Sequence, residues 1–157
     1  MPDSLANRIA LTLKEMNGLY HHLLLVVGPG GSGKTVALRS VAEGAGSKVI
    51  NVNLALSRRM LELTERQRAL KLPSLLGDII AEQEGETLFL DNTEILFDVA
   101  LKQDPLRLLQ ALSRNRYIVA TWSGHADGDH LTYADPEHAE YRRYSTKGLL
   151  IVTNALT

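Results

Sequence analysis

The feature that most constrains this chain is an eight-residue loop motif in its first quarter. The motif reads Gly28-Pro29-Gly30-Gly31-Ser32-Gly33-Lys34-Thr35. It matches the pattern G-x-x-x-x-G-K-[ST] at every fixed position. The glycines let the backbone wrap around an anion without Cβ clashes, so that N–H groups point at phosphate oxygens. Lys34 can reach the β and γ phosphates and Thr35 can hold Mg²⁺, so the motif predicts a site for a nucleoside triphosphate.

The segments on either side of this loop fit the context that it needs. Residues 22–27 form a short apolar run that ends at the first glycine, as a buried parallel strand does. Residues 35–43 suit a helix, and Gly44 can cap its end. A helix that begins at the loop directs the positive end of its dipole at the anion. A glycine-rich turn with a chance Lys-Thr pair is the alternative, and the setting disfavours it.

Apolar runs and helical stretches alternate along the rest of the chain. We expect strands at 48–53, 87–91, 117–122 and 148–153, helices at 4–17, 57–71, 73–83 and 105–113, and a loop at 123–140. Pro73 is expected to begin a new helix. This alternation predicts an α/β fold of the P-loop NTPase type. Its three layers, α/β/α, are expected to contain a five-stranded, mostly parallel sheet. The expected strand order is the RecA/AAA-like 5-1-4-3-2.

Size and composition narrow the classes of protein. The 157 residues predict one domain, with an N-terminal helix within residues 1–18 and no separate C-terminal lid domain. A net charge of −1 gives no sign of a general nucleic-acid coat or membrane surface. The absence of cysteine excludes disulfides and thiolate metal sites. No signal peptide or apolar run of about 18 residues is present, so we expect a soluble, cytoplasmic protein with no membrane partner.

An acid at the end of the strand 87–91 supplies the second nucleotide signature. Asp91 follows a mostly apolar strand and would share Mg²⁺ with Thr35, through water. ATPases with an extra strand between the loop strand and the acidic strand usually have Glu directly after the aspartate, but here that position holds Asn92. Glu94 is the candidate for orienting the attacking water. Alternatively, Glu94 only begins a short helix near 93–97, and turnover would then be slow.

Hydroxyl groups near the end of the strand 117–122 complete the candidate catalytic set. In the predicted order this strand lies between the first and third strands, so Thr121 or Ser123 would face the γ-phosphate or the attacking water. They join Lys34, Asn92 and Glu94 in that set. The alternative is that they are ordinary strand-end hydroxyls.

Two arginine pairs can stabilise the charge that develops on a transferred phosphoryl group. Arg114 and Arg116 precede the fourth expected strand, and Arg142 and Arg143 precede the fifth. In ring-forming ATPases an arginine just before the fifth strand often reaches a neighbour's nucleotide, so the chain itself, as a homo-oligomer, is a candidate partner. An exposed surface pair is the alternative.

A second basic group has the spacing of a helix surface. Its members are Arg58, Arg59, Arg66, Arg68 and Lys71. Interspersed glutamates favour a solvated face with helical ion pairs, and a surface for DNA phosphates or a protein partner is the alternative. The histidines and aspartates between residues 125 and 138 match no familiar zinc spacing, so a loop over the active site is the better interpretation.

Stretches along almost the whole chain carry a family resemblance. They are residues 18–21, 50–54, 62–68, 90–97, 102–106, 112–116 and 131–134. In these stretches the chain resembles BrxF, the family of small P-loop proteins of type III BREX phage-defence systems. The resemblance implies an accessory ATPase of a bacterial defence island that also has a DNA methyltransferase, a large ATPase, a phosphatase-like protein and a helicase. Only residues 28–35 and Asp91 carry over as site residues, and the offset of Glu94 belongs to the family pattern.

Three functions are consistent with these features. The leading hypothesis is a slow or partner-stimulated ATPase that uses ATP and Mg²⁺ and acts with other BREX components, with copies of itself or with DNA. The second is a small-molecule phosphotransferase, whose lid would be residues 123–146. The third is a nucleotide-dependent switch that barely hydrolyses ATP, which the absence of Glu at position 92 favours.

Overall fold

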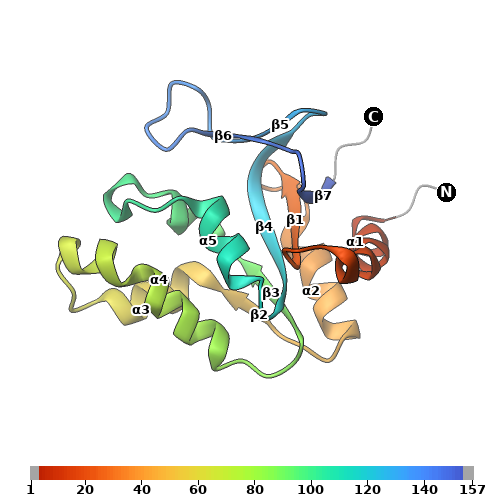
Figure 1. The fold of residues 1–157 in the computed structure, drawn as a ribbon, viewed down its shortest axis with the longest axis horizontal. Helices are drawn as coiled ribbons and strands as arrows, with labels where there is room; N and C mark the ends of the chain where they lie inside the picture. The colour runs from red at the N-terminus through yellow and green to blue at the C-terminus, as the bar shows by residue number, and fades with distance from the viewer. Residues whose placement is uncertain (1–3, 154–157) are drawn as a thin grey trace.

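The computed structural model describes residues 4–153, and its centre is a seven-stranded sheet with helices on both faces (Figure 1). Five strands are parallel neighbours in the order β2-β3-β4-β1-β7. Their bounds are β1 Leu23–Gly28, β2 Val49–Asn51, β3 Thr87–Asp91, β4 Tyr117–Ala126 and β7 Leu150–Thr153. Because β7 is the fifth parallel strand, the predicted α/β fold and the order 5-1-4-3-2 are confirmed.

One face of the sheet is covered by two helices. These are α1 (Leu5–Leu13), which continues into the 3₁₀ turn η1 (Lys14–Gly18), and α2 (Lys34–Gly44). The Ser4 hydroxyl accepts a hydrogen bond from the N–H of Asn7 and caps α1, as predicted; the other candidate cap, Asp3, lies outside the described residues. Leu24 and Val26 of β1 point to this face and are fully buried under the two helices.

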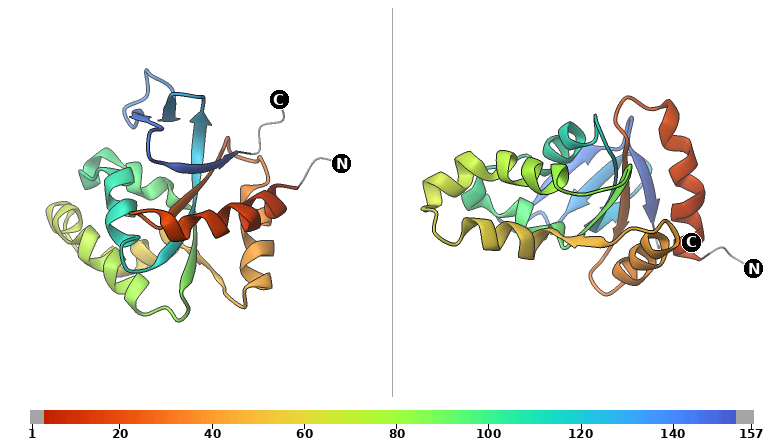
Figure 2. Two further views of the ribbon diagram at one scale, coloured as in Figure 1. Left: turned by 45° about the vertical axis from the view of Figure 1, so that its right-hand side comes forward. Right: turned by 90° about the horizontal axis from the view of Figure 1, so that it is seen from below.

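The opposite face carries the remaining helices (Figure 2). They are α3 (Val52–Met60), α4 (Glu65–Ala81), η2 (Thr93–Phe97), η3 (Val99–Leu101) and α5 (Pro105–Leu112). Asp104 caps α5 by accepting a hydrogen bond from the N–H of Arg107, and Pro105 occupies the first turn, as predicted. Among residues 4–153 no helix has the length and apolar character needed to cross a membrane.

The predicted helix boundary at Pro73 is wrong, because α4 runs through this residue. A proline inside a helix removes the hydrogen bond to the carbonyl four residues earlier. Here that carbonyl belongs to Ala69, and the side-chain amide of Gln103 donates to it at 2.9 Å. A side chain from the segment just before α5 therefore satisfies the acceptor that the proline leaves open.

The predicted loop at 123–140 is also wrong, and so is the prediction of only five strands. β4 continues to Ala126 and pairs with β5 (His130–Tyr133), which pairs with β6 (Arg142–Ser145), both antiparallel. We call β5 and β6 with their connecting segment the β5–β6 extension; it projects beyond the parallel sheet in Figure 1. Gly124 permits this pairing, since a Cβ there would lie 1.9 Å from the carbonyl oxygen of Thr132.

Aromatic packing fixes the β5–β6 extension to the body of the protein. The ring of Tyr133 stacks on Phe97 of η2 at a centroid distance of 3.6 Å, and Trp122 meets the same phenyl ring edge-on at 4.9 Å. The Trp122 indole N–H donates to the carbonyl of Thr132 at 3.0 Å. The hydroxyl of Tyr144 donates to Asp104 at 2.9 Å, which connects β6 to the cap of α5.

Candidate functional site

The glycine-rich loop joins the carboxyl end of β1 to the first turn of α2, which is where the motif predicts it. Gly31 and Gly33 have φ angles of +76° and +89°, a region that residues with a Cβ rarely adopt. At Gly28 a Cβ would lie 2.6 Å from the hydroxyl oxygen of Ser32. The backbone therefore requires glycine at positions 31 and 33, whereas a Cβ at position 28 would displace the Ser32 hydroxyl.

Lys34 is folded over this loop. Its ammonium donates to the carbonyl oxygens of Gly28 and Pro29 at 2.8 and 2.7 Å, and only 6% of the residue is exposed. Burial lowers the pKa of Lys34 below its ordinary value, and the negative charges of Glu94 and Asp91 partly oppose that shift. The ammonium thus already lies among the loop carbonyls and within the field of both carboxylates.

Asp91 joins the loop helix to the central strands. Its two carboxylate oxygens accept hydrogen bonds from different hydroxyls, Thr35 at 2.7 Å and Thr121 at 2.8 Å. Asp91 and Thr121 are both buried. A hydroxyl and a carboxylate at the first turn of a phosphate-loop helix are the oxygen donors that Mg²⁺ prefers. Thr35 and Asp91 can therefore hold this metal.

Glu94 lies in the first turn of η2, as the alternative interpretation of this residue expects, but it also reaches β4. Its carboxylate accepts a hydrogen bond from the Ser123 hydroxyl at 2.7 Å. Asn92, between Asp91 and Glu94, has a φ of +55°, which asparagine tolerates better than most residues. This turn directs the chain after β3 toward β4, so the structure brings the carboxylate and the hydroxyl together.

The sequence reasoning did not single out Thr93. This residue is 1% exposed, and its hydroxyl donates to the carbonyl of Thr121 at 2.6 Å. The bond fixes η2, and with it Glu94, to the strand that carries Thr121 and Ser123. The sequence carries no clear signal for this role, because the burial of the Thr93 hydroxyl is seen only in the structure.

The four candidate arginines occupy two different regions. Arg114 and Arg116 directly precede β4. Because β4 and β1 are parallel, these arginines lie at the amino-terminal end of the strands, whereas the glycine loop follows the carboxyl end of β1. Arg116 donates to the carbonyl of Gln83 at 2.7 Å. Arg142 and Arg143 lie in β6. Arg142 donates to the carbonyl of Gln103 at 2.8 Å, whereas the more exposed Arg143 contacts the ring nitrogen Nδ1 of His130 at 3.3 Å. No hydrogen bond connects any of them to the glycine loop within the described residues.

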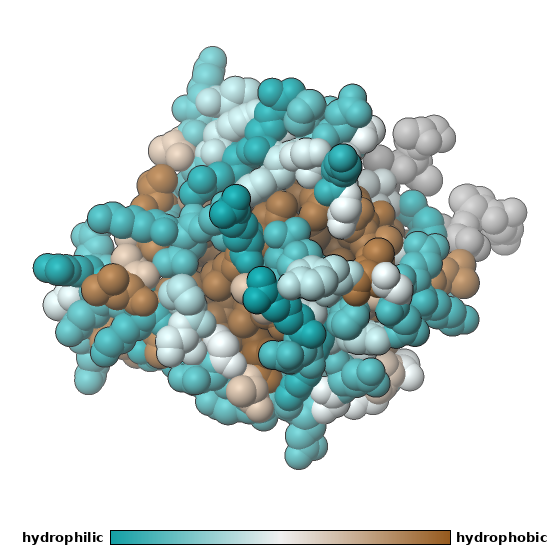
Figure 3. Space-filling view, viewed as in Figure 1, coloured by the Kyte–Doolittle hydropathy of each residue, from teal (hydrophilic) through white to brown (hydrophobic). Residues whose placement is uncertain are grey.

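The second basic group lies on α3 and α4, whose surface is mostly hydrophilic on the face seen in Figure 3. Arg59 forms an ion pair with Glu82 at 2.6 Å, and Arg68 donates to the backbone carbonyl of Leu63 at 3.1 Å. Arg58, Arg66 and Lys71 are exposed and take part in neither of the two ion pairs among residues 4–153. The same described residues contain no group of three or more histidines and acids that could hold a metal.

Hollows adjoin the loop and the residues after β3. One of about 370 Å³ is lined by Thr35, Asp91 and Asn92 together with residues of α2 and β2. Another of about 560 Å³ lies on the other side of Asn92, next to Glu94. A third, of about 340 Å³, lies between Gly28 and the extended part of β4, at His125. The loop residues therefore border open space on several sides.

Solved structures that are similar to this chain include the following three. One is a DNA replication initiation factor, which matches this chain with a TM-score of 0.50 and 18% sequence identity. The match covers 98% of this chain and 47% of the initiation factor. C. elegans PCH-2 has a TM-score of 0.49 and 13% identity (99% and 44%). AMPPCP-bound DnaA from Aquifex aeolicus has a TM-score of 0.45 and 18% identity (100% and 48%).

The fold is a three-layer α/β/α P-loop NTPase fold with the RecA/AAA-like order of parallel strands. The chain spans less than half of the length of each of these three proteins. No protein-family model matches the sequence, and no curated protein does so either. At this level of identity the comparison concerns the fold, so the activity of this chain has to be argued from its own residues.

Proposed function

We propose that this chain is an ATP-binding P-loop NTPase with slow or partner-stimulated ATP hydrolysis. The observation that carries the proposal is the 2.7 Å hydrogen bond between Thr35 and Asp91 at the first turn of the loop helix. This contact supports the proposal because it brings together a hydroxyl and a carboxylate, the kinds of oxygen ligand that Mg²⁺ uses in nucleotide sites. Backbone N–H groups of the glycine-rich loop, residues 28–35, and the Lys34 ammonium bind the phosphates.

The remaining residues divide the work of hydrolysis. Bound Mg²⁺ would supply charge that offsets the negative charge on the phosphates. Glu94 orients and deprotonates the water, and Ser123 holds the Glu94 carboxylate through their 2.7 Å hydrogen bond. Thr121 positions Asp91 from β4 and can sense the γ-phosphate. Asn92 supplies the turn that sets the distance between the two acids.

Two measurements test this proposal. Calorimetry should show ATP binding that strengthens with Mg²⁺, and Asp91→Asn should remove the gain from Mg²⁺ while leaving binding without Mg²⁺ nearly unchanged. In a single-turnover assay, Glu94→Gln should slow hydrolysis about 100-fold or more. Glu62→Gln, at an exposed position before α4, is the control. Equal rates for wild type and Glu94→Gln would exclude Glu94 as the base and favour a nucleotide-dependent switch.

For the biological role, we propose that the chain is an accessory component of a type III BREX system in the bacterial cytoplasm, with other BREX components or copies of itself as partners. The resemblance to BrxF along the chain supports this role. Arg143, the more exposed of the β6 arginines, is the best candidate to reach the nucleotide of a second copy. DNA contact at Arg58, Arg66 and Lys71 predicts an affinity that falls steeply with salt. Absent or salt-independent DNA binding would remove that part of the proposal.

A second candidate function is a small-molecule phosphotransferase. It is favoured by the pocket of about 560 Å³ that has Glu94 in its wall, together with Glu140 from the β5–β6 extension. A phosphoryl acceptor in that pocket would lie beside the candidate base. ATP consumption that rises when a small acceptor is added, rather than when DNA or protein is added, would distinguish this activity from the ATPase.

A further inference from the structure

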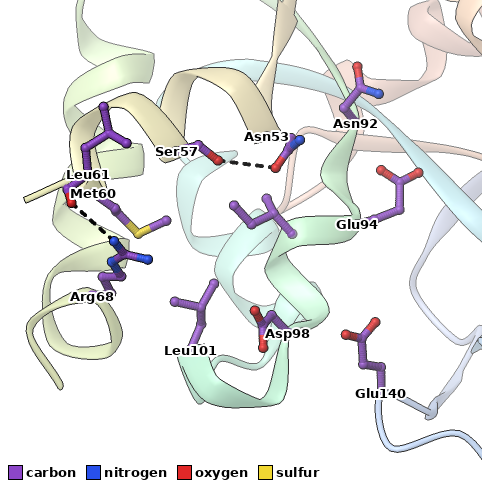
Figure 4. A pocket seen from close by; sticks show the side chains of 11 residues that line it. Asn53, Ser57, Met60, Leu61, Arg68, Asn92, Glu94, Asp98, Leu101 and Glu140 are labelled. Carbon is purple, nitrogen blue, oxygen red and sulfur yellow. Dashed lines mark hydrogen bonds between the residues drawn. The ribbon is translucent and has the colours of Figure 1, made fainter. Parts of the chain in front are cut away.

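A pocket beside Glu94 is large enough for a small molecule and is separate from the hollow at Thr35 and Asp91. Its volume of about 560 Å³ falls within the range of about 300–1,000 Å³ that small-molecule sites occupy. It opens to solvent and is lined by α3, the start of α4, the turns η2 and η3, and the segment between β5 and β6 (Figure 4). Only Asn92 also lines the hollow at Thr35 and Asp91, so the two spaces are neighbours rather than one.

The lining has an apolar part and an acidic part. Met60, Ile95 and Leu101 supply apolar side chains to the pocket. Glu94, Asp98 and Glu140 supply carboxylates, the first two from η2 and its C-cap and the third from the β5–β6 extension (Figure 4). Such a lining suits a ligand that has an aliphatic body and a polar end.

Two of the three carboxylates of this pocket accept hydrogen bonds, Glu94 from Ser123 and Asp98 from the N–H of Ala100, and the charge of Glu94 also acts on Lys34. Neither of the two ion pairs described among residues 4–153 includes any of the three carboxylates. The pocket's one guanidinium, that of Arg68, is directed to the backbone carbonyls of Leu61 and Leu63. Burial raises the pKa of Tyr133 to about 12, and the charges of Glu140 and Glu94 add to that shift. The pocket therefore favours a cation.

We propose that this pocket binds an aliphatic chain bearing a positively charged amine or guanidinium. The methylene groups lie on Met60, Ile95 and Leu101, while the cation lies among the carboxylates of Glu94, Asp98 and Glu140. This binding goes beyond nucleotide hydrolysis and does not require it. Because Glu94 belongs to both sites, a bound cation lies directly beside the candidate catalytic carboxylate.

A calorimetric titration of the full chain with 1,8-diaminooctane, in the absence of nucleotide, tests this proposal. We expect saturable binding that weakens about threefold to fivefold in Glu140→Gln, which removes one partly exposed charge. Glu137→Gln is the matched control, since Glu137 is exposed on the same segment but does not line the pocket. The shorter 1,4-diaminobutane should bind more weakly, because fewer methylenes reach the apolar part. The neutral 1,8-octanediol should not bind measurably.

The same titration distinguishes the sources of such a cation. If a short lysine-rich peptide binds with the same dependence on Glu140 and the free diamines do not, the natural ligand is a basic side chain of a partner. If the diamines bind as well, a free polyamine is the ligand. Binding that is absent for both, or that weakens equally in Glu137→Gln and Glu140→Gln, would overturn the proposal. Because no nucleotide is present, this result is independent of whether the chain hydrolyses ATP.

Discussion

Replacing Lys34 by alanine should weaken ATP binding by a predictable amount. The ammonium is almost fully buried and donates to the carbonyl oxygens of Gly28 and Pro29 at 2.8 and 2.7 Å. Truncating one partner of a buried charge pair lowers affinity by about 2–5 kcal/mol. To meet a phosphate, the ammonium must release at least one carbonyl contact, and a hydrogen bond to a charged group contributes about 1.5 kcal/mol or more. We therefore expect the lower part of the range.

The expected loss is about 2–3 kcal/mol, which raises the Kd for ATP by about 30-fold to 150-fold. Calorimetry with ATP and Mg²⁺ at constant ionic strength measures it. Lys14→Ala is the control, because Lys14 is an exposed lysine in η1, outside the glycine loop. The thermal unfolding of both variants should be compared first, so that a folding defect is not mistaken for a binding defect. An unchanged Kd in a folded Lys34→Ala protein would refute the assignment of the loop.

Three further predictions concern stability. Burial lowers the pKa of Lys34, so just below pH 10.5 the unfolded chain binds more protons at this residue than the folded one does. The unfolding free energy of the wild type, compared with that of Lys34→Met, should therefore rise as the pH approaches 10.5 from below. Tyr144→Phe removes the hydrogen bond to Asp104 and should lower the unfolding free energy by about 1–2 kcal/mol, while the exposed Tyr20→Phe should change it little. Gly124→Ala should destabilise by about 2–4 kcal/mol, because its Cβ would overlap the Thr132 carbonyl oxygen, and Gly128→Ala, in open space, should not. Urea unfolding curves of the five variants measure all three, and a stable Gly124→Ala protein would contradict the pairing of β4 with β5.

Local patterns were sufficient to predict the strand–loop–helix unit and the order of the parallel strands. An eight-residue motif fixes the turn between β1 and α2, and apolar runs of limited length fix the strands around it. The proximity of Asp91 to Thr35 also follows from the order, because the carboxyl ends of parallel strands share one edge. These features depend on short sequence spans and on general rules of chain topology.

The wrong predictions have long-range causes. Pro73 does not break α4, since Gln103, thirty-four positions from Ala69, supplies the missing donor. The segment 130–133 has the alternation of a half-buried strand, with Leu131 and Tyr133 buried and their neighbours less so, but its polar composition favoured a loop. The strand is held by long-range contacts such as the packing of Tyr133 on Phe97, which joins residues far apart in the sequence.

The position of Glu94 depends on the same packing. An acid directly after Asp91 would be placed by the strand itself, whereas an acid three residues later needs its own support. The turn at Asn92, the bond from Thr93 to β4 and the stacking of Phe97 on Tyr133 supply that support. The β5–β6 extension therefore contributes to the candidate catalytic site without touching the phosphate loop, because it holds the turn from which Glu94 reaches Ser123. A change that loosens the extension should consequently affect hydrolysis more than ATP binding.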